Sequence, residues 1–272
     1  MAENSNEMSF LDHLEELRWH LIRSTLAIVI IASVAFIAKD FIFDTILFGP
    51  KKIDFFTYEL FCNLSKSLGQ GNSLCIDEMP FRIQSRTMSG QFSAHLWTSL
   101  TAGFIIAFPY ILFEFWRFIS PGLHESERKN ARGFIFIASI LFFIGVLFGY
   151  YIVTPLSINF LGNYTVSSEV FNDFDLSSYI SLLRASVLSS GLIFELPILM
   201  YFLTKIGLVT PMFLKNNRKF AIVIVLILSA VITPPDIASQ VIVTIPILIL
   251  YEVSIFISKV VYNRQQKELK NV

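Results

Sequence analysis

Acidic side chains inside apolar stretches are the residues of this sequence with the clearest chemical meaning. Glu195 lies within such a stretch, two residues before Pro197. An ionised carboxylate in hydrocarbon is costly unless it is paired, hydrated or protonated, and a proline kinks a helix and frees a backbone carbonyl one turn back. We therefore expect a hydrated polar pocket around Glu195, or else a protonated Glu195 that is hydrogen-bonded within the protein.

The other polar residues give no case for catalysis. Glu114 and Glu252 lie near the ends of apolar stretches, where Arg117 and Lys259 are available as ordinary ion-pair partners. The sequence has four histidines and two cysteines, and it shows no nucleophile–base set, no phosphate-binding loop and no His/Cys metal motif. We therefore expect neither an enzyme nor a bound cofactor or metal.

The composition points to a membrane as the environment that positions these acids. Hydrophobic residues make up 54% of the chain and charged residues only 15%, whereas a soluble domain carries about 25% charged residues. The 21 basic residues balance the 21 acidic ones, so nothing indicates nucleic acid as a partner. Six apolar stretches follow one another, at 24–38, 92–113, 133–158, 185–204, 220–235 and 237–251.

Stretches of this length must be helices in hydrocarbon, because every backbone amide there has to be hydrogen-bonded internally. The sequence therefore predicts an all-α, polytopic membrane protein with six transmembrane helices. Four of the helices contain a proline: Pro109, Pro155, Pro197 and Pro246. Bent helices of this kind would form a curved, concave wall. The last two stretches are short for a hydrocarbon layer of about 30 Å, which requires snorkelling Lys and Arg side chains or a thinner bilayer.

The basic residues indicate on which side of the membrane each loop lies. Lys and Arg cluster before the first stretch, between the second and third, between the fourth and fifth, and after the sixth, whereas segments 154–178 and 233–236 contain none. Both termini are therefore predicted to be cytoplasmic. We expect a leader helix at 1–20, a transmembrane domain at 21–258 with an external loop at about 41–91, and a cytoplasmic tail at 259–272.

The leader has a helical pattern of its own. Its apolar residues recur at spacings of four, three and four, which places them on one helical face: Phe10, Leu14, Leu17 and Leu21. The pattern predicts an amphipathic helix at the cytoplasmic surface. Its acids suit a basic ligand better than a negatively charged lipid leaflet.

The long loop after the first stretch holds both cysteines, Cys62 and Cys75. A bacterial periplasm would be oxidising, so the two residues either form a disulfide or remain unpaired thiols. No neighbouring histidine supports a metal site instead.

Four segments stand out in this layout, at 13–21, 118–129, 194–197 and 233–240. Together they resemble the TatC family, the multi-spanning core of the twin-arginine protein translocase. The resemblance covers essentially the whole chain and agrees with six spans and cytoplasmic termini. The chain departs from the family pattern at His20, where Arg is frequent, at Glu114, where Gln is usual, and in its longer first external loop.

The resemblance implies that Glu16 and Glu127 recognise the paired arginines of a signal peptide. A guanidinium binds a carboxylate through two parallel hydrogen bonds, which a Lys ammonium cannot reproduce, so two such acids would select Arg-Arg over Lys-Lys. Without the family, Glu16 reads as a solvated position of the leader, and Glu127 as an acid stabilised by the dipole of the third helix.

The resemblance also implies supporting roles for other residues. Those expected to shape the same site or to contact partners are Arg18, Phe118, Pro121, Leu123 and Arg128. Glu195 matches a polar site for the transmembrane helix of a partner. On the external side lie Pro50, Asp236 and Gln240, and the last two also suit a simple helix cap.

The implied function is that of a receptor and assembly platform in the cell inner membrane, in contact with the lipid bilayer. It would bind Arg-Arg signal peptides of folded proteins, recruit TatA-like and TatB-like single-span proteins, associate with itself, and use the proton motive force rather than ATP. The alternative is a proton-coupled secondary transporter of small molecules, which would also have kinked spans and an intramembrane Glu. Such a transporter should show an inverted repeat, and none is visible by inspection.

Overall fold

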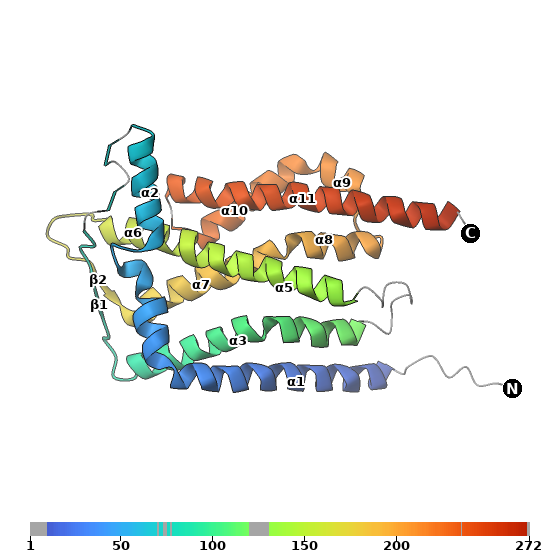
Figure 1. The fold of residues 1–272 in the computed structure, drawn as a ribbon, viewed down its shortest axis with the longest axis horizontal. Helices are drawn as coiled ribbons and strands as arrows, with labels where there is room; N and C mark the ends of the chain where they lie inside the picture. The colour runs from blue at the N-terminus through green and yellow to red at the C-terminus, as the bar shows by residue number, and fades with distance from the viewer. Residues whose placement is uncertain are drawn as a thin grey trace. The chain divides into compact units, whose positions relative to one another are not determined.

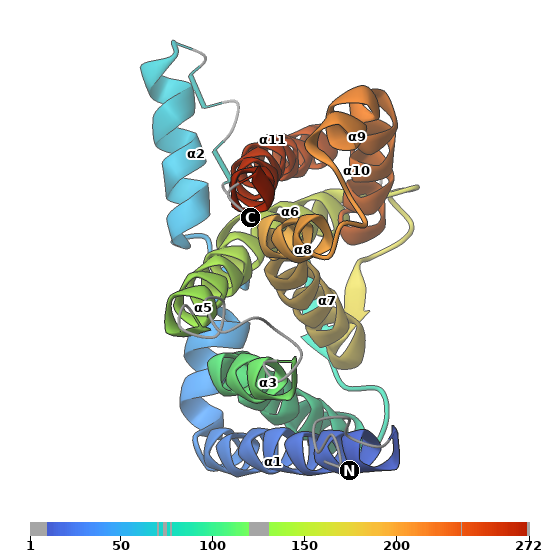
Figure 2. The same ribbon diagram turned by 90° about the vertical axis from the view of Figure 1, so that its right-hand side faces the viewer.

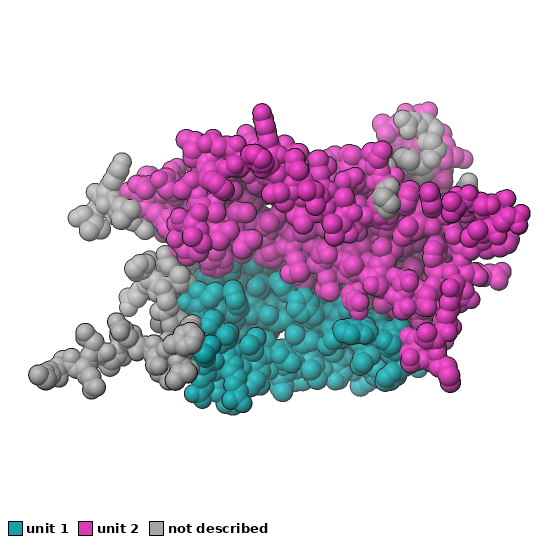
Figure 3. Space-filling view, turned by 180° about the vertical axis from the view of Figure 1, so that it is seen from behind, with its two compact units in different colours: residues 1–39, 92–140 teal, residues 40–91, 141–272 magenta. Residues whose placement is uncertain are grey.

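The computed structural model describes residues 10–69, 71–72, 75–76, 78–119, 131–234 and 236–270. The chain divides into two compact units, which are coloured separately in Figure 3. Unit 1 comprises residues 1–39 and 92–140, and unit 2 comprises residues 40–91 and 141–272. Two helices, α3 and α5, run from one unit into the other.

Unit 1 is built from long helices: α1 (Phe10–Ile37), nearly all of α3 (Gly90–Ile119) and the first part of α5 (Ala131–Phe148). Figure 1 shows α1 and α3 side by side and antiparallel. They approach closely at Gly103, where a Cβ atom would lie 2.7 Å from the carbonyl oxygen of Ile28. A side chain at this position would force the helices apart, so glycine sets their spacing.

The first helix differs from the division that the sequence suggested. We expected a leader helix to end near residue 20, before the first span, but α1 continues without a break from Phe10 to Ile37. The physical reason is that no proline or glycine occurs within this range, so nothing interrupts the backbone hydrogen bonds. The charged residues after position 13 therefore belong to the same continuous helix as the first apolar stretch.

Unit 2 holds the remaining elements. In chain order these are η1 (Phe41–Leu47), η2 (Gly49–Lys51), α2 (Phe56–Ser67), β1 (Arg82–Gln84), η4 (Gly149–Val153), α6 (Thr154–Asn163), β2 (Asp173–Asp175), α7 (Leu176–Phe194), α8 (Leu196–Lys205), α9 (Pro211–Asn216), α10 (Arg218–Ile232) and α11 (Ile237–Lys270). Figures 1 and 2 both place α11 beside α8. A buried hydrogen bond of 2.8 Å joins the Thr204 and Ser258 hydroxyls of these two helices.

Small residues let the helices of unit 2 pack closely. A Cβ atom on Gly145 would lie 2.6 Å from the Ser190 carbonyl oxygen, and one on Gly149 would lie 2.7 Å from that of Ser186. Because a hydrophobic driving force between helices is absent in lipid, such close backbone approach is a principal source of packing energy. An apolar core of Val153, Val225, Val243 and Ile247 adds to it.

Among the described residues, five helical segments are long and apolar enough to cross a membrane: Leu14–Ile37, Gly90–Ile119, Gly133–Asn163, Leu176–Lys205 and Ser239–Lys267. The remaining apolar stretch forms α10, whose 15 residues extend over about 22 Å. The predicted all-α membrane fold is confirmed, and each of the six stretches is helical over nearly all of its length.

The predicted shortness of the last helix is wrong. Helix α11 has 34 residues and extends over about 51 Å, because the helix continues through the charged residues that follow Tyr251. Charge ended the apolar stretch in the sequence but does not end the helix.

The prolines act in two ways. Pro155 and Pro197 lie in the first turn of α6 and α8, just after the preceding helical segment has ended or widened into a π-helix. Proline is tolerated there, since its missing N–H has no helical partner in any case. Pro109 and Pro246 lie inside α3 and α11, which continue through them.

The segments predicted to be external meet in unit 2. Strand β1, from the first loop, pairs in parallel with β2, from the segment between the third and fourth spans, with Arg82 opposite Asp173. A disulfide joins Cys62 to Cys75. Burial raises the pKa of the Tyr58 phenol, whose hydroxyl donates to the carbonyl oxygens of Pro50 (2.8 Å) and Pro155 (3.1 Å).

Candidate functional site

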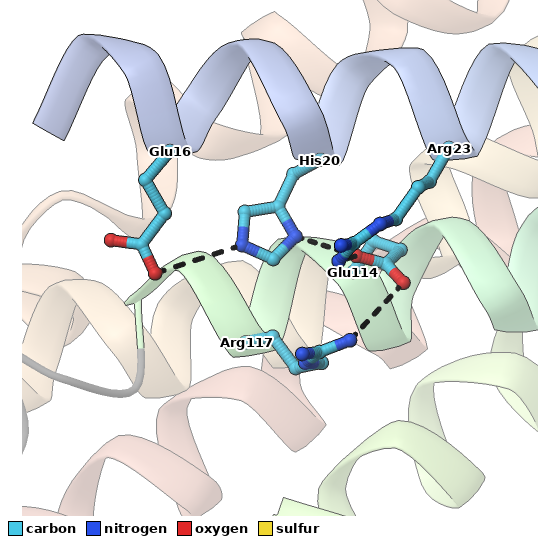
Figure 4. A network of polar contacts seen from close by, with 5 residues as sticks. All are labelled: Glu16, His20, Arg23, Glu114 and Arg117. Atoms are coloured by element: carbon cyan, nitrogen blue, oxygen red, sulfur yellow. Dashed lines mark hydrogen bonds and ion pairs between the residues drawn. The ribbon is translucent and has the colours of Figure 1, made fainter. Parts of the chain in front are cut away.

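A cluster of charged side chains joins α1 and α3 in unit 1 (Figure 4). Glu16, His20 and Arg23 lie on one face of α1 because their spacings of four and three match the helical repeat. Glu114 and Arg117 lie one turn apart on α3. We call these five residues the α1–α3 cluster.

Glu114 is the centre of the α1–α3 cluster. It is 1% exposed, and its Oε2 atom lies 2.5 Å from Nδ1 of His20. Arg117 lies 3.6 Å from Oε1, and Arg23 lies 3.8 Å from Oε2. A buried carboxylate needs such compensation, because the loss of hydration costs several kcal/mol unless opposite charges and hydrogen bonds replace it.

The sequence predicted the Glu114–Arg117 pair but missed the contacts across the two helices. His20 is 7% exposed and makes the shortest of the ion-pair contacts to Glu114. The spacing of Glu16, His20 and Arg23 was a usable signal for a charged helix face. The partner of that face could not be read from spacing, since it depends on how α1 and α3 pack.

Glu16 is the most accessible carboxylate of the α1–α3 cluster. Its side chain is 36% exposed, and Oε1 lies 4.0 Å from Nε2 of His20. The ring of Phe118 packs edge-on against the His20 imidazole, with 6.1 Å between the two ring centroids. Arg18 is exposed on the same helix and is not a member of the cluster. Two residues of the predicted site, Glu16 and Phe118, are thus both neighbours of His20.

The rest of the predicted recognition site lies outside the described residues. This applies to Glu127 and to three residues expected to shape the site: Pro121, Leu123 and Arg128. The pairing of Glu16 with Glu127 therefore stays a prediction.

Glu195 lies at the break between α7 and α8, where it ends one helix and precedes the other. Its Oε1 atom is buried and has no hydrogen-bond partner among the described residues. The break follows from Pro197, which cannot donate to the carbonyl one turn back. The predicted kink is present.

The residues predicted on the external side have structural contacts. The carbonyl of Pro50 accepts from Tyr58. Asp236 Oδ2 accepts from the backbone N–H of Ser239 at 2.8 Å, which is a helix N-cap for α11. Gln240 Nε2 donates to the Leu226 carbonyl at 3.1 Å and so connects α11 to α10.

Within the described ranges, no three His, Cys, Asp or Glu side chains converge as metal ligands.

Comparisons with known proteins identify the family of this chain. The family described as "Sec-independent protein translocase protein (TatC)" matches residues 12–246. A TatC of this description from Blattabacterium sp. subsp. Periplaneta americana is 49% identical over 259 residues, which cover 95% of this chain and 97% of that protein. TatCy of Bacillus subtilis is 33% identical over 262 residues, which cover 96% of this chain and 93% of that protein.

A solved structure agrees with the sequence relatives. The crystal structure of a twin-arginine translocase receptor TatC superposes with a TM-score of 0.67 and 34% identity, and the match covers 92% of this chain and 99% of that one. The resemblance predicted from the four sequence segments is confirmed, and the comparisons favour a translocase over a small-molecule transporter. The chain belongs to the TatC family of Sec-independent protein translocase proteins.

Proposed function

We propose that this chain is the signal-peptide receptor and core subunit of a twin-arginine translocase, which exports folded proteins across the cell inner membrane. Membership of the TatC family supports this role, as does the similarity to a solved protein described as a twin-arginine translocase receptor. The role also accounts for the α1–α3 cluster, because the cluster places acidic side chains near the ends of two long helices.

The accessible carboxylate of Glu16 is the observation that carries the proposal. Glu16 lies on α1 beside a cluster that holds α1 and α3 together, so the carboxylate is presented from a rigid support. An arginine of the ligand would donate two parallel hydrogen bonds to it, and this geometry distinguishes guanidinium from ammonium. Glu127, in the segment after α3, would receive the second arginine.

Partners and energy source complete the proposal. The buried Oε1 of Glu195 is suited to accept a polar contact from the single transmembrane helix of a TatA-like or TatB-like protein. Both chain termini would lie in the cytoplasm, and assemblies of several copies would form the working complex. Export would draw on the proton motive force.

Peptide binding tests the receptor role. A fluorescent Arg-Arg signal peptide is titrated against the full chain in lipid nanodiscs, beside the Lys-Lys version of the same peptide. Wild type should prefer Arg-Arg by at least about tenfold, and Glu16→Gln and Glu127→Gln should each lose most of that preference.

Glu15→Gln is the matched control, because Glu15 is an exposed acid of the same helix and is not a member of the α1–α3 cluster. It should bind like wild type. Equal binding of both peptides by a folded wild-type protein would refute the receptor role. A loss in Glu15→Gln as large as that in Glu16→Gln would refute the specific site.

A further inference from the structure

Two carboxylates of the α1–α3 cluster compete for one histidine ring. His20 places Nδ1 at 2.5 Å from Glu114 and Nε2 at 4.0 Å from Glu16. The first distance is a short hydrogen bond, whereas the second is beyond hydrogen-bond length. Figure 4 draws both contacts, and only the one to Glu114 has the length of a hydrogen bond, so Glu114 is the main partner of the ring.

The burial of the three groups explains this outcome. Glu114 is 1% exposed and His20 is 7% exposed, while the side chain of Glu16 is 36% exposed. A charge pair withdrawn from water is electrostatically stronger than one that water screens. The buried acid of α3 thus attracts the imidazole more strongly than the hydrated acid of its own helix does.

The same acid, Glu114, also contacts two arginines. Arg23 from α1 and Arg117 from α3 lie within 4 Å of its oxygens, with side chains about half exposed. The Tyr110 hydroxyl of α3 is a further hydrogen-bond partner of Glu114. In the described residues, the titratable and charged groups around the His20–Glu114 pair are therefore Glu16 and Arg23 from α1, and Tyr110 and Arg117 from α3.

An uncharged side chain at position 114 would change this balance. The nearest described carboxylate to the ring would then be Glu16, one helical turn away. A protonated imidazole paired with Glu16 would occupy the oxygens that a ligand guanidinium needs. The receptor would be blocked by its own side chain.

We propose that Glu114 is a positioning residue of the receptor site, which holds the chain's own basic side chains, His20 above all, away from Glu16 and so leaves that carboxylate open for the arginines of a signal peptide. The proposal rests on the proposed function, because it assigns the role of Glu114 to the binding of the same ligand. Glu114 itself is buried and need not touch the peptide.

The test is Arg-Arg peptide binding to the full chain near pH 6 and near pH 8. Glu114→Gln should bind about fivefold more weakly than wild type near pH 6 and less than about twofold more weakly near pH 8, because imidazole loses its charge between about pH 5 and 8. Wild type should change less than about twofold over this range, since its ring stays at Glu114. A purely structural role of Glu114 would not produce a defect that disappears at high pH.

Removal of the competitor should restore binding. In His20→Gln/Glu114→Gln both the acid and the imidazole are gone, and two amides can hydrogen-bond in their place, so the double variant should bind like wild type near pH 6. Glu252→Gln is the matched control, because Glu252 also pairs with an arginine, at 2.7 Å from Arg218, but in unit 2. It should bind normally.

Two outcomes overturn the proposal: wild-type affinity of Glu114→Gln near pH 6, or no recovery in the double variant. If Glu114→Gln does not fold, the single variant His20→Gln decides, because it should keep wild-type affinity. Its loss of binding would mean that His20 assists the ligand rather than competes with it. A wild-type protein without Arg-Arg preference would instead refute the proposed function, and with it this role of Glu114.

Discussion

Two acids of this protein lie in helical segments that are long and apolar enough to cross a membrane, and their surroundings differ: Glu114 is fully buried, whereas Glu195 is half-buried. Glu114 has one histidine and two arginine side chains within 4 Å. Glu195 has a buried oxygen with no hydrogen-bond partner among the described residues, at a break between two helices.

The difference fits two distinct roles: Glu114 organises the packing of α1 against α3, whereas Glu195 is proposed to contact a partner helix. The charge of Glu114 is balanced internally, so its carboxylate stabilises the α1–α3 packing and has little left for a ligand. Glu195 is not balanced in this way, so a partner helix that supplies a donor would gain a hydrogen bond in a site that water scarcely screens. Under the proposed function, the same residue type serves two purposes.

Removal of Glu114 should cause the largest loss of stability. Glu114→Ala leaves His20, Arg23 and Arg117 without their common partner, so we expect the free energy of unfolding to fall by about 3 kcal/mol. Chemical unfolding in mild detergent measures this change. A loss below about 1 kcal/mol would contradict the structural role assigned to Glu114.

The next largest loss of stability is expected when the glycines that set helix spacing are replaced. Alanine at Gly103 in unit 1, or at Gly145 in unit 2, would place its Cβ atom within 3 Å of the backbone of the neighbouring helix. Each substitution should destabilise the protein by about 2 kcal/mol, because the helices must separate. Gly133→Ala is the control, since a Cβ atom there meets nothing within 4 Å. Equal effects at all three positions would refute the close-approach argument.

Glu195→Gln should leave stability within about 0.5 kcal/mol of wild type, because the buried oxygen loses no partner. Capture of single-span TatA-like or TatB-like proteins should nevertheless weaken about fivefold, as expected for one interhelical hydrogen bond. Co-purification from nanodiscs measures this. Unchanged capture together with a large loss of stability would reverse the contrast between Glu195 and Glu114.

The smallest effect is expected at the exposed ion pair between Arg218 and Glu252. Both side chains are about half exposed, at 49% and 54%, so water screens the pair despite its 2.7 Å separation. Glu252→Gln should change the free energy of unfolding by about 0.5 kcal/mol, measured as for Glu114→Ala. A loss near that of Glu114→Ala would show that burial does not decide the strength of these pairs.

Much of the fold could be predicted from the sequence because hydropathy and length are local properties. All six apolar stretches are helical, and the break beside Pro197 is present. The extent of α11 was underestimated, since charged residues end an apolar stretch without ending a helix. Continuity of α1 through residue 20 was missed for a similar reason.

The candidate site was harder to predict, because it depends on how two helices meet. Glu16 and Phe118 could be named from the family motifs, but nothing local revealed that both would neighbour His20. The contact between His20 and Glu114 joins positions 94 residues apart. Only the packing of α1 against α3 brings them together.

A double-mutant cycle between receptor and ligand tests the central claim most directly. Wild type and Glu16→Gln are each titrated with the Arg-Arg peptide and with peptides in which one arginine is replaced by glutamine. If Glu16 binds one arginine of the pair, one of these combinations should show a coupling energy of about 1.5 kcal/mol or more. A coupling energy near zero for both arginines, in a protein that binds the Arg-Arg peptide, would contradict the account.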